Sequence, residues 1–171
     1  DPVARVRLGS VLARQNKLDA AGAQLERALE LRPDDIDGLR FLGEVRAIQR
    51  RDADAVALYE RTLRLTPNDL DLALRLAAVL ADSRDTAVRN GPRATALAEQ
   101  AVQATRRQDV RALEVLAVAL GSSGRFAEAA ATAREAAALA RSRGESRRAD
   151  ALEYRAVAYD YAAQQGFVPQ R

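Results

Sequence analysis

Two short runs of the sequence carry residue types that can bind ions. Residues 34–38, Asp-Asp-Ile-Asp-Gly, begin like a calcium-binding loop, in which closely spaced carboxylates surround the cation. The third acidic position of that spacing is missing, and no glutamate stands at the far end of the loop. The acidic residues recur 34 residues later as Asp69 and Asp71, so helix capping explains both pairs. We therefore predict no metal site.

The second run is Gly-Ser-Ser-Gly-Arg at residues 121–125, whose backbone N–H groups could hold an anion beside the arginine. It lacks the spacing and the lysine of a phosphate-binding loop. It also falls where two helical patterns must be joined, which favours a turn. The chain contains no Cys and no His, which removes thiolate nucleophiles and the usual proton carrier near neutral pH. We predict that the protein is not an enzyme and binds no cofactor.

The composition favours a helical, folded chain. Of the 171 residues, 38 are Ala and 22 are Leu, whereas only two are Ile, and the unbranched residues lose less conformational freedom in a helix. The net charge of +3 is spread along the chain rather than clustered, so we predict no nucleic-acid partner. No apolar run approaches the roughly 20 residues of a membrane span. Arg used almost to the exclusion of Lys suggests a bacterial gene, with a cytoplasmic or periplasmic location left open.

The strongest pattern is an internal repeat. Residues 26–35 recur as residues 60–69, an offset of 34, and the same offset maps Leu8-Gly9 onto Leu42-Gly43. Apolar residues within each period follow helical spacing and are interrupted once by a polar break, so each period is predicted to be two helices joined by a turn. We expect units at residues 2–35, 36–69, 70–109 and 110–143, followed by a helix at about 146–165.

Helix ends are also visible in the sequence. Asp35, Asp69 and Asp109 each precede an apolar helical run and are predicted N-caps. The third unit is longer, and we place an inserted loop at residues 83–92, followed by a second helix around residues 93–105. Asn-Gly-Pro at the end of that loop is strong turn chemistry.

In these features the sequence resembles the tetratricopeptide repeat (TPR) family. The matching positions of the first two units are Gly9, Ala21, Ala28, Pro33, Gly43, Ala55, Tyr59 and Pro67. The early Trp of the family is absent throughout, and Thr62 replaces an Ala. The resemblance implies an all-α, right-handed α-solenoid of about four TPR units plus a C-terminal helix, forming one array over residues 1–171.

In such a solenoid the first helix of each unit lines the concave side. The positions that we predict to face inward are Val6, Ser10, Asp37, Arg40, Glu44, Asp71, Leu74, Arg75, Arg111, Glu114 and Val118. Family members that bind chaperone C-termini use a Lys/Asn/Arg clamp for a carboxylate. Of the corresponding residues here only Arg75 fits, so we expect that clamp to be absent. Mixed charges predict an extended or helical peptide partner instead.

The C-terminal helix carries two apolar stripes. Tyr154, Val157 and Tyr161 form the second stripe, on a side away from the first. Two interpretations remain open: the tail at residues 167–169 folds over this stripe, or the stripe is a surface for self-association or for a partner.

The function predicted from the sequence is a non-catalytic protein–protein interaction module that binds a partner peptide or helix in its groove. Asp1 is in register with Asp35 and Asp69, so we expect the chain to be a piece of a longer array. Two alternatives are kept: a substrate-recruiting arm of a larger enzyme such as a glycosyltransferase, and a homo-oligomeric scaffold that assembles through the C-terminal helix.

Overall fold

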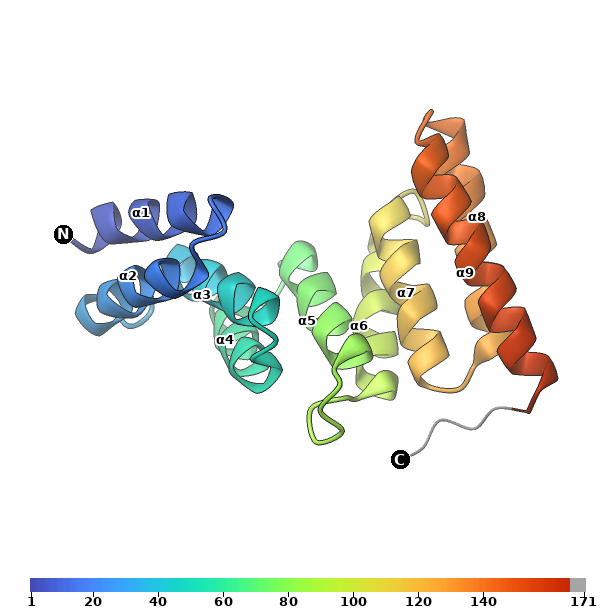
Figure 1. Cartoon of the computed structure of the whole chain (residues 1–171), viewed down its shortest axis with the longest axis horizontal. Coiled ribbons are helices and arrows are strands. Elements are labelled where there is room, and N and C mark those ends of the chain that lie inside the picture. The colour runs from blue at the N-terminus through green and yellow to red at the C-terminus, as the bar shows by residue number, and fades with distance from the viewer. Residues whose placement is uncertain (167–171) are drawn as a thin grey trace. The chain divides into compact units, whose positions relative to one another are not determined.

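The computed structural model describes residues 1–166, and in this part of the chain it contains nine helices and no strand (Figure 1). The all-α fold class is therefore confirmed. The helices are α1 (Pro2–Arg14), α2 (Leu18–Leu31), α3 (Ile36–Ile48), α4 (Asp52–Leu65), α5 (Leu70–Asp82), α6 (Gly91–Ala104), α7 (Val110–Ser122), α8 (Phe126–Ser142) and α9 (Ser146–Gln164).

Side-chain caps start the first helix of each pair. The carboxylates of the three predicted aspartates accept hydrogen bonds from free backbone N–H groups: Asp35 from Gly38 at 2.9 Å, Asp69 from Leu72 at 3.0 Å and Asp109 from Arg111 at 2.8 Å. These bonds satisfy donors that have no partner within the helix. The predicted capping role of all three residues is confirmed.

The turn between paired helices uses a different device. Asn16, Arg50, Gly124 and Gly144 each hold a left-handed backbone, with φ between 59° and 78°. This conformation reverses the chain after the first helix, and the next helix then begins without a side-chain cap. The run at residues 121–125 is such a turn, closed by backbone hydrogen bonds from Gly124 to Gly121 and from Arg125 to Leu120. The prediction of a turn at this site is confirmed.

The connection between α5 and α6 is shorter than the predicted loop. Helix α6 begins at Gly91 rather than near residue 93, because the Asn90 side chain accepts a hydrogen bond from the Arg93 N–H at 3.0 Å. The backbone N–H of Asn90 donates to Leu80 O at 2.8 Å. Residues 83–90 thus fold back onto the end of α5, and Gly91-Pro92 belongs to the helix.

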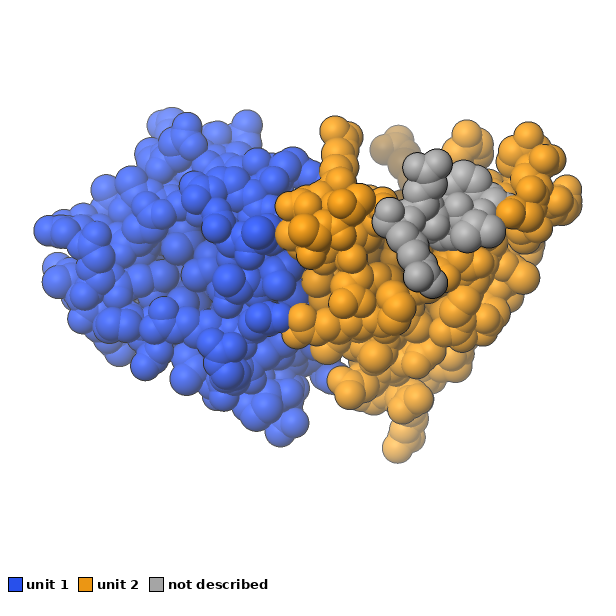
Figure 2. Space-filling view, turned by 90° about the horizontal axis from the view of Figure 1, so that it is seen from below, with its two compact units in different colours: residues 1–79 blue, residues 80–171 orange. Residues whose placement is uncertain are grey.

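The chain divides into two compact units, which Figure 2 shows in different colours. Unit 1 comprises Asp1–Val79, and unit 2 begins at Leu80. The boundary falls inside α5, so the last residues of that helix belong to unit 2.

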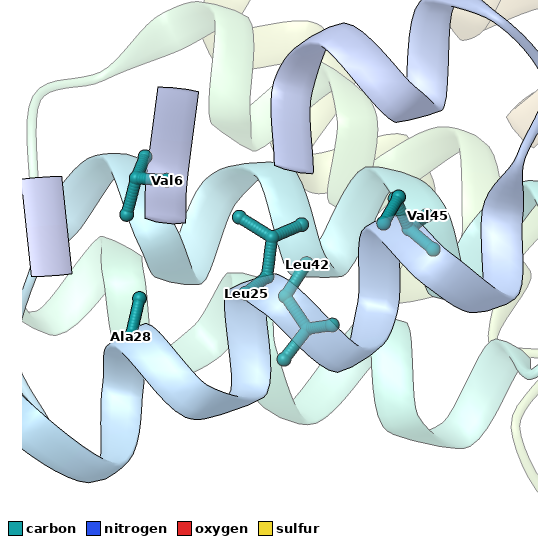
Figure 3. Packing of buried hydrophobic residues seen from close by; sticks show 6 residues of the cluster. Val6, Leu25, Ala28, Leu42 and Val45 are labelled. Carbon is teal, nitrogen blue, oxygen red and sulfur yellow. The ribbon is translucent and has the colours of Figure 1, made fainter. Parts of the chain in front are cut away.

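The core of unit 1 lies between consecutive helix pairs. Val6 of α1, Leu25 and Ala28 of α2, and Leu42 and Val45 of α3 pack into one cluster (Figure 3). Two glycines let the paired helices approach closely. A Cβ added at Gly9 would lie 2.6 Å from Leu25 Cγ, and one at Gly43 would lie 2.5 Å from Tyr59 Cε1. The repeat offset of 34 residues therefore relates two equivalent contacts of glycine with a large side chain.

The core of unit 2 depends on alanine. Helix α8 buries Ala129, Ala130, Ala133, Ala136, Ala137 and Ala140. Ala117, Ala133 and Ala156 form a cluster that joins α7, α8 and α9, and Tyr159 packs against it. The Tyr159 ring also fills the space beside Gly121, where an added Cβ would lie 2.5 Å from Cε1. Such small side chains allow helix backbones to approach one another.

Helix α9 covers α8 through its first apolar stripe, in which Ala149, Leu152 and Ala156 are almost completely buried. Ion pairs frame this contact: Arg134 pairs with Asp160, and Arg141 Nη2 lies 3.7 Å from Asp150 Oδ1. The C-terminal helix predicted from the sequence is thus an integral part of unit 2.

Candidate functional site

The residues predicted to face a partner in unit 1 differ in burial. Val6 and Leu74 are only 7% and 3% exposed and contribute to the core, so they offer almost no surface to a partner. The other predicted residues keep part of their side chains accessible. They are Ser10, Asp37, Arg40, Glu44, Asp71 and Arg75.

Arg75 brings three of these residues together in one network. Its Nε lies 2.7 Å from Asp71 Oδ2, and its Nη1 lies 3.1 Å from Glu44 Oε1. Burial lowers the pKa of Arg75, but the hydrogen bond to Asp71 and the charge of Glu44 outweigh it and raise that pKa above its ordinary value. All three charges are therefore compensated inside unit 1.

Tyr59 lies against this network from the core side and is 2% exposed. Burial raises the pKa of its hydroxyl to about 12, and the Glu44 carboxylate raises it further, while the hydrogen bond with Arg75 acts in the opposite direction. The hydroxyl thus stays protonated at neutral pH. This arrangement links the packing of α3 on α4 to the charges on the accessible face.

A second pair on the same helix face is formed by Asp37 and Arg40. Arg40 Nη2 donates to Asp37 Oδ1 at 2.7 Å, and its guanidinium carbon lies 5.4 Å from the centre of the Phe41 ring. The distance to the ring is within the range of a cation–π contact. Both interactions hold the arginine close to its own helix.

An apolar hollow of about 350 Å³ lies between α1 and α3 of unit 1. Ala13, Phe41, Val45 and Ile48 supply its apolar surface, and Ser10, Arg14 and Glu44 supply its polar atoms. Ile48 is 59% exposed, although it is one of the largest apolar residues of the unit. Only Ser10 and Glu44 of these residues were among the predicted inward positions. The repeat offset relates Arg14 to Ile48, and this relation is the signal that could have found them.

In unit 2 the predicted residues are tied to α9. Glu114 accepts a hydrogen bond from Arg148 Nη2 at 3.0 Å, and Arg155 Nη1 lies 3.6 Å from its second oxygen. Arg111 and Val118 are half-buried on the same helix. The Glu114 carboxylate therefore joins α7 to α9, and its charge is compensated within the unit.

Helix pairs joined by a tight turn, capped by Asp and repeated every 34 residues are shared with a known family. A sequence model of the tetratricopeptide repeat family matches residues 6–69. The chain is a tetratricopeptide repeat protein. No curated protein matches the chain.

Solved structures share the fold of this TPR protein at low sequence identity. MamA from Desulfovibrio magneticus RS-1 is 16% identical with a TM-score of 0.68, and the match covers 94% of this chain and 96% of that one. YrrB, described as a TPR protein with an unusual peptide-binding site, is 20% identical with a TM-score of 0.64 over 93% and 86% of the two chains. These likenesses establish a TPR-type solenoid.

The carboxylate clamp known from some TPR proteins has one candidate residue here. That residue, Arg75, already holds Asp71 and Glu44, while Val6 at another clamp position is buried. These positions of the TPR fold are therefore engaged within the unit, in line with the expectation from the sequence.

Helix α9 of the TPR protein exposes its second stripe. Tyr154 is 79% exposed, Val157 58% and Tyr161 65%. No described residue covers these three side chains. The tail that was one predicted cover, residues 167–169, lies outside the described residues.

A polar hollow of about 280 Å³ in unit 2 was not predicted. Its charged residues pair with one another or with their neighbours: Arg107 with Glu135, and Arg125 with Glu128 at 2.7 Å and Glu99 at 3.8 Å. Because these pairs are satisfied internally, the hollow offers few free groups to a ligand.

Two further properties concern the described residues as a whole. No group of three or more acidic residues in this part of the TPR chain is arranged to hold a metal ion. None of its helices combines the length and the apolar character needed to cross a membrane.

Proposed function

We propose that this TPR protein is a non-catalytic interaction module, in which the first helices of the repeats bind an extended or helical segment of a partner protein. The apolar hollow of unit 1 is the observation that carries the proposal. Apolar surface that stays accessible in a folded domain is costly unless it is used, and Ile48 and Phe41 place such surface on the first-helix face.

Family and fold support the same conclusion. TPR units bind protein or peptide partners in general, and YrrB is a TPR protein with a peptide-binding site. A face made by stacked helices exists before the partner arrives, so binding requires little ordering of the module. The ion pairs of Arg75 and Arg40 hold the surrounding side chains in place, which adds to this preorganisation.

A peptide library displayed on phage tests the proposal. Peptides selected on the wild-type protein are measured against two variants, Ile48→Asp and Leu31→Asp. Both replaced side chains are large, apolar and more than half exposed, but only Ile48 lines the hollow. We expect Ile48→Asp to weaken binding at least about tenfold, a loss of about 1.4 kcal/mol, while Leu31→Asp binds like the wild type.

Two results would contradict this function. One is a selection that yields no specific peptide. The other is a set of peptides whose binding falls equally in both variants, which would place the contact elsewhere. Circular dichroism of each variant shows whether the helices remain folded.

Self-association is a second candidate function, favoured by the exposed stripe of α9. Tyr154 and Tyr161 are large aromatic side chains that gain most from burial in an interface. Light scattering over a concentration series should then show a mass that rises with concentration in the wild type and stays monomeric in Tyr154→Ser/Tyr161→Ser. A wild-type monomer at every concentration would rule this function out.

A further inference from the structure

The size and lining of the hollow in unit 1 limit what it can hold. Its volume of about 350 Å³ is at the lower end of the range for ligand pockets, which suits one or two side chains of a peptide better than a cofactor. Ala13, Phe41, Val45 and Ile48 offer no hydrogen-bonding side chain. The side chain that enters must therefore be aliphatic or aromatic.

The charge beside the hollow comes from α1. Arg14 lines the hollow, and no described residue forms a hydrogen bond or an ion pair with its guanidinium. Arg7 and Ser10 share a helix face with Arg14, because their spacing of three and then four residues returns to the same side. The Arg7 side chain is likewise exposed and unpaired. Residues 2–14 contain no Asp or Glu that would compensate these charges.

The opposite wall does not neutralise α1. Glu44 is the only acidic residue that lines the hollow, and it is held by Arg75 at 3.1 Å. Arg40 is held in turn by Asp37 at 2.7 Å. The uncompensated charge at the hollow is therefore positive, and its complement on a partner is a carboxylate, which arginine binds with two parallel hydrogen bonds.

We infer that the hollow between α1 and α3 recognises an acidic peptide segment, which inserts one bulky apolar side chain beside Phe41 and Ile48 and places a carboxylate on Arg14. The inference rests on the function proposed above and specifies the chemistry of the segment. The carboxylate belongs to an Asp or Glu within the peptide, so a free C-terminus is not needed. An apolar hollow flanked by two arginines suits a protein segment, whereas a phosphate backbone needs a longer basic stripe.

Fluorescence anisotropy with three short labelled peptides tests this inference. Each peptide carries a central Leu-Phe pair and blocked termini, and the flanking residues are Glu in the first, Gln in the second and Lys in the third. We expect the Glu peptide to bind the wild-type protein most tightly and the Lys peptide most weakly, with a difference that shrinks as salt is added.

Charge reversal at the protein completes the test. Arg14→Glu should weaken the Glu peptide about tenfold and strengthen the Lys peptide. The matched control is Arg64→Glu, which reverses an exposed and unpaired arginine of the same unit on α4, away from the hollow. Arg64→Glu should bind all three peptides almost as the wild type does.

The outcomes separate this inference from the proposed function. If the three peptides bind equally and Ile48→Asp still abolishes binding, the acidic preference is wrong and the interaction module stands. If Arg14→Glu and Arg64→Glu change binding alike, the carboxylate does not lie on Arg14. If neither these peptides nor the phage library yields binding, both proposals fail.

Discussion

The two units solve the same packing problem with different side chains. At the helix crossing of unit 1, glycine meets a large residue, in the pairs Gly9–Leu25 and Gly43–Tyr59. At the position of unit 2 that corresponds in sequence, Ala117 meets Ala133. The contact between glycine and an aromatic ring reappears in unit 2 between Gly121 and Tyr159 of α9. The repeat thus preserves close packing, and the choice of residues within each crossing is free.

A second difference concerns one position of the first helix. Val6 of unit 1 is buried in the apolar cluster, whereas its counterpart in unit 2 is Glu114, which pairs with Arg148 and Arg155. Unit 1 therefore joins α1 to its neighbours through apolar burial, and unit 2 joins α7 to α9 through charge. The comparison shows that one helix position can serve core or surface, depending on what the next helix supplies.

The largest expected effect is at Tyr59. Tyr59→Ala should lower the free energy of unfolding by about 3–5 kcal/mol, because it empties a fully buried ring. Gly43→Ala alone should cost about 1–3 kcal/mol, since the new Cβ overlaps that ring. In the Tyr59→Ala background the same change should stabilise by up to about 1 kcal/mol, because alanine favours a helix over glycine.

Urea unfolding of the four proteins in this cycle measures the coupling, and hydrogen exchange of α3 and α4 locates it. The matched change in unit 2 is Ala117→Gly, which should cost about 1 kcal/mol through helix propensity. An equal cost of Gly43→Ala in both backgrounds would show that the glycine is not required by the ring.

The next effect compares Val6 with Glu114. Val6→Glu should cost at least about 2 kcal/mol, because it places a carboxyl group in an apolar cluster without a partner. Glu114→Val should change stability by at most about 1 kcal/mol, since Glu114, Arg148 and Arg155 are all partly exposed. Thermal unfolding of both variants checks the asymmetry. Similar losses in the two variants would mean that the apolar and ionic junctions are equally sensitive to substitution.

The smallest effect is a dependence on alkaline pH. The folded protein holds the Tyr59 proton up to about pH 12, whereas an unfolded tyrosine releases it at its ordinary pKa near 10. The stabilisation is therefore complete below pH 10 and is lost as the pH rises towards 12, with a slope of at most about 1.4 kcal/mol per pH unit. Tyr59→Phe should remove this part of the slope.

The ultraviolet absorbance of phenolate, followed beside the unfolding transition, checks the assignment. Tyr159 provides the parallel in unit 2, because burial raises the pKa of its hydroxyl as well. If Tyr59→Phe leaves the alkaline slope unchanged, the buried hydroxyl of Tyr59 is not its source.

The sequence predicted the helices and the repeat because both depend on local spacing. The aspartate caps and the buried stripe with Ala149 and Leu152 follow from periodicities that any helix must satisfy. The accessible face is harder to predict, since a shift of one residue turns a side chain by about 100° around the helix axis. Val6 and Leu74 lie on the buried side of that limit, and Ile48 lies on the accessible side.

Contacts between helices far apart in sequence were beyond prediction. Arg46 is buried although arginine belongs by default to the surface, because Gly22 leaves room for its guanidinium and Glu26 pairs with it. The bridge from Glu114 to α9 likewise depends on how two helices are placed in space. No single stretch of sequence contains either arrangement.

The contact between Gly43 and Tyr59 also bears on how such a chain evolves. A substitution at either residue alone passes through a state with an overlap or an empty space, so the two positions resist stepwise drift. Duplication of a whole 34-residue unit copies both partners together and avoids that intermediate. Genes for such arrays should therefore lengthen by copying entire repeats more readily than they exchange the residues at their helix crossings.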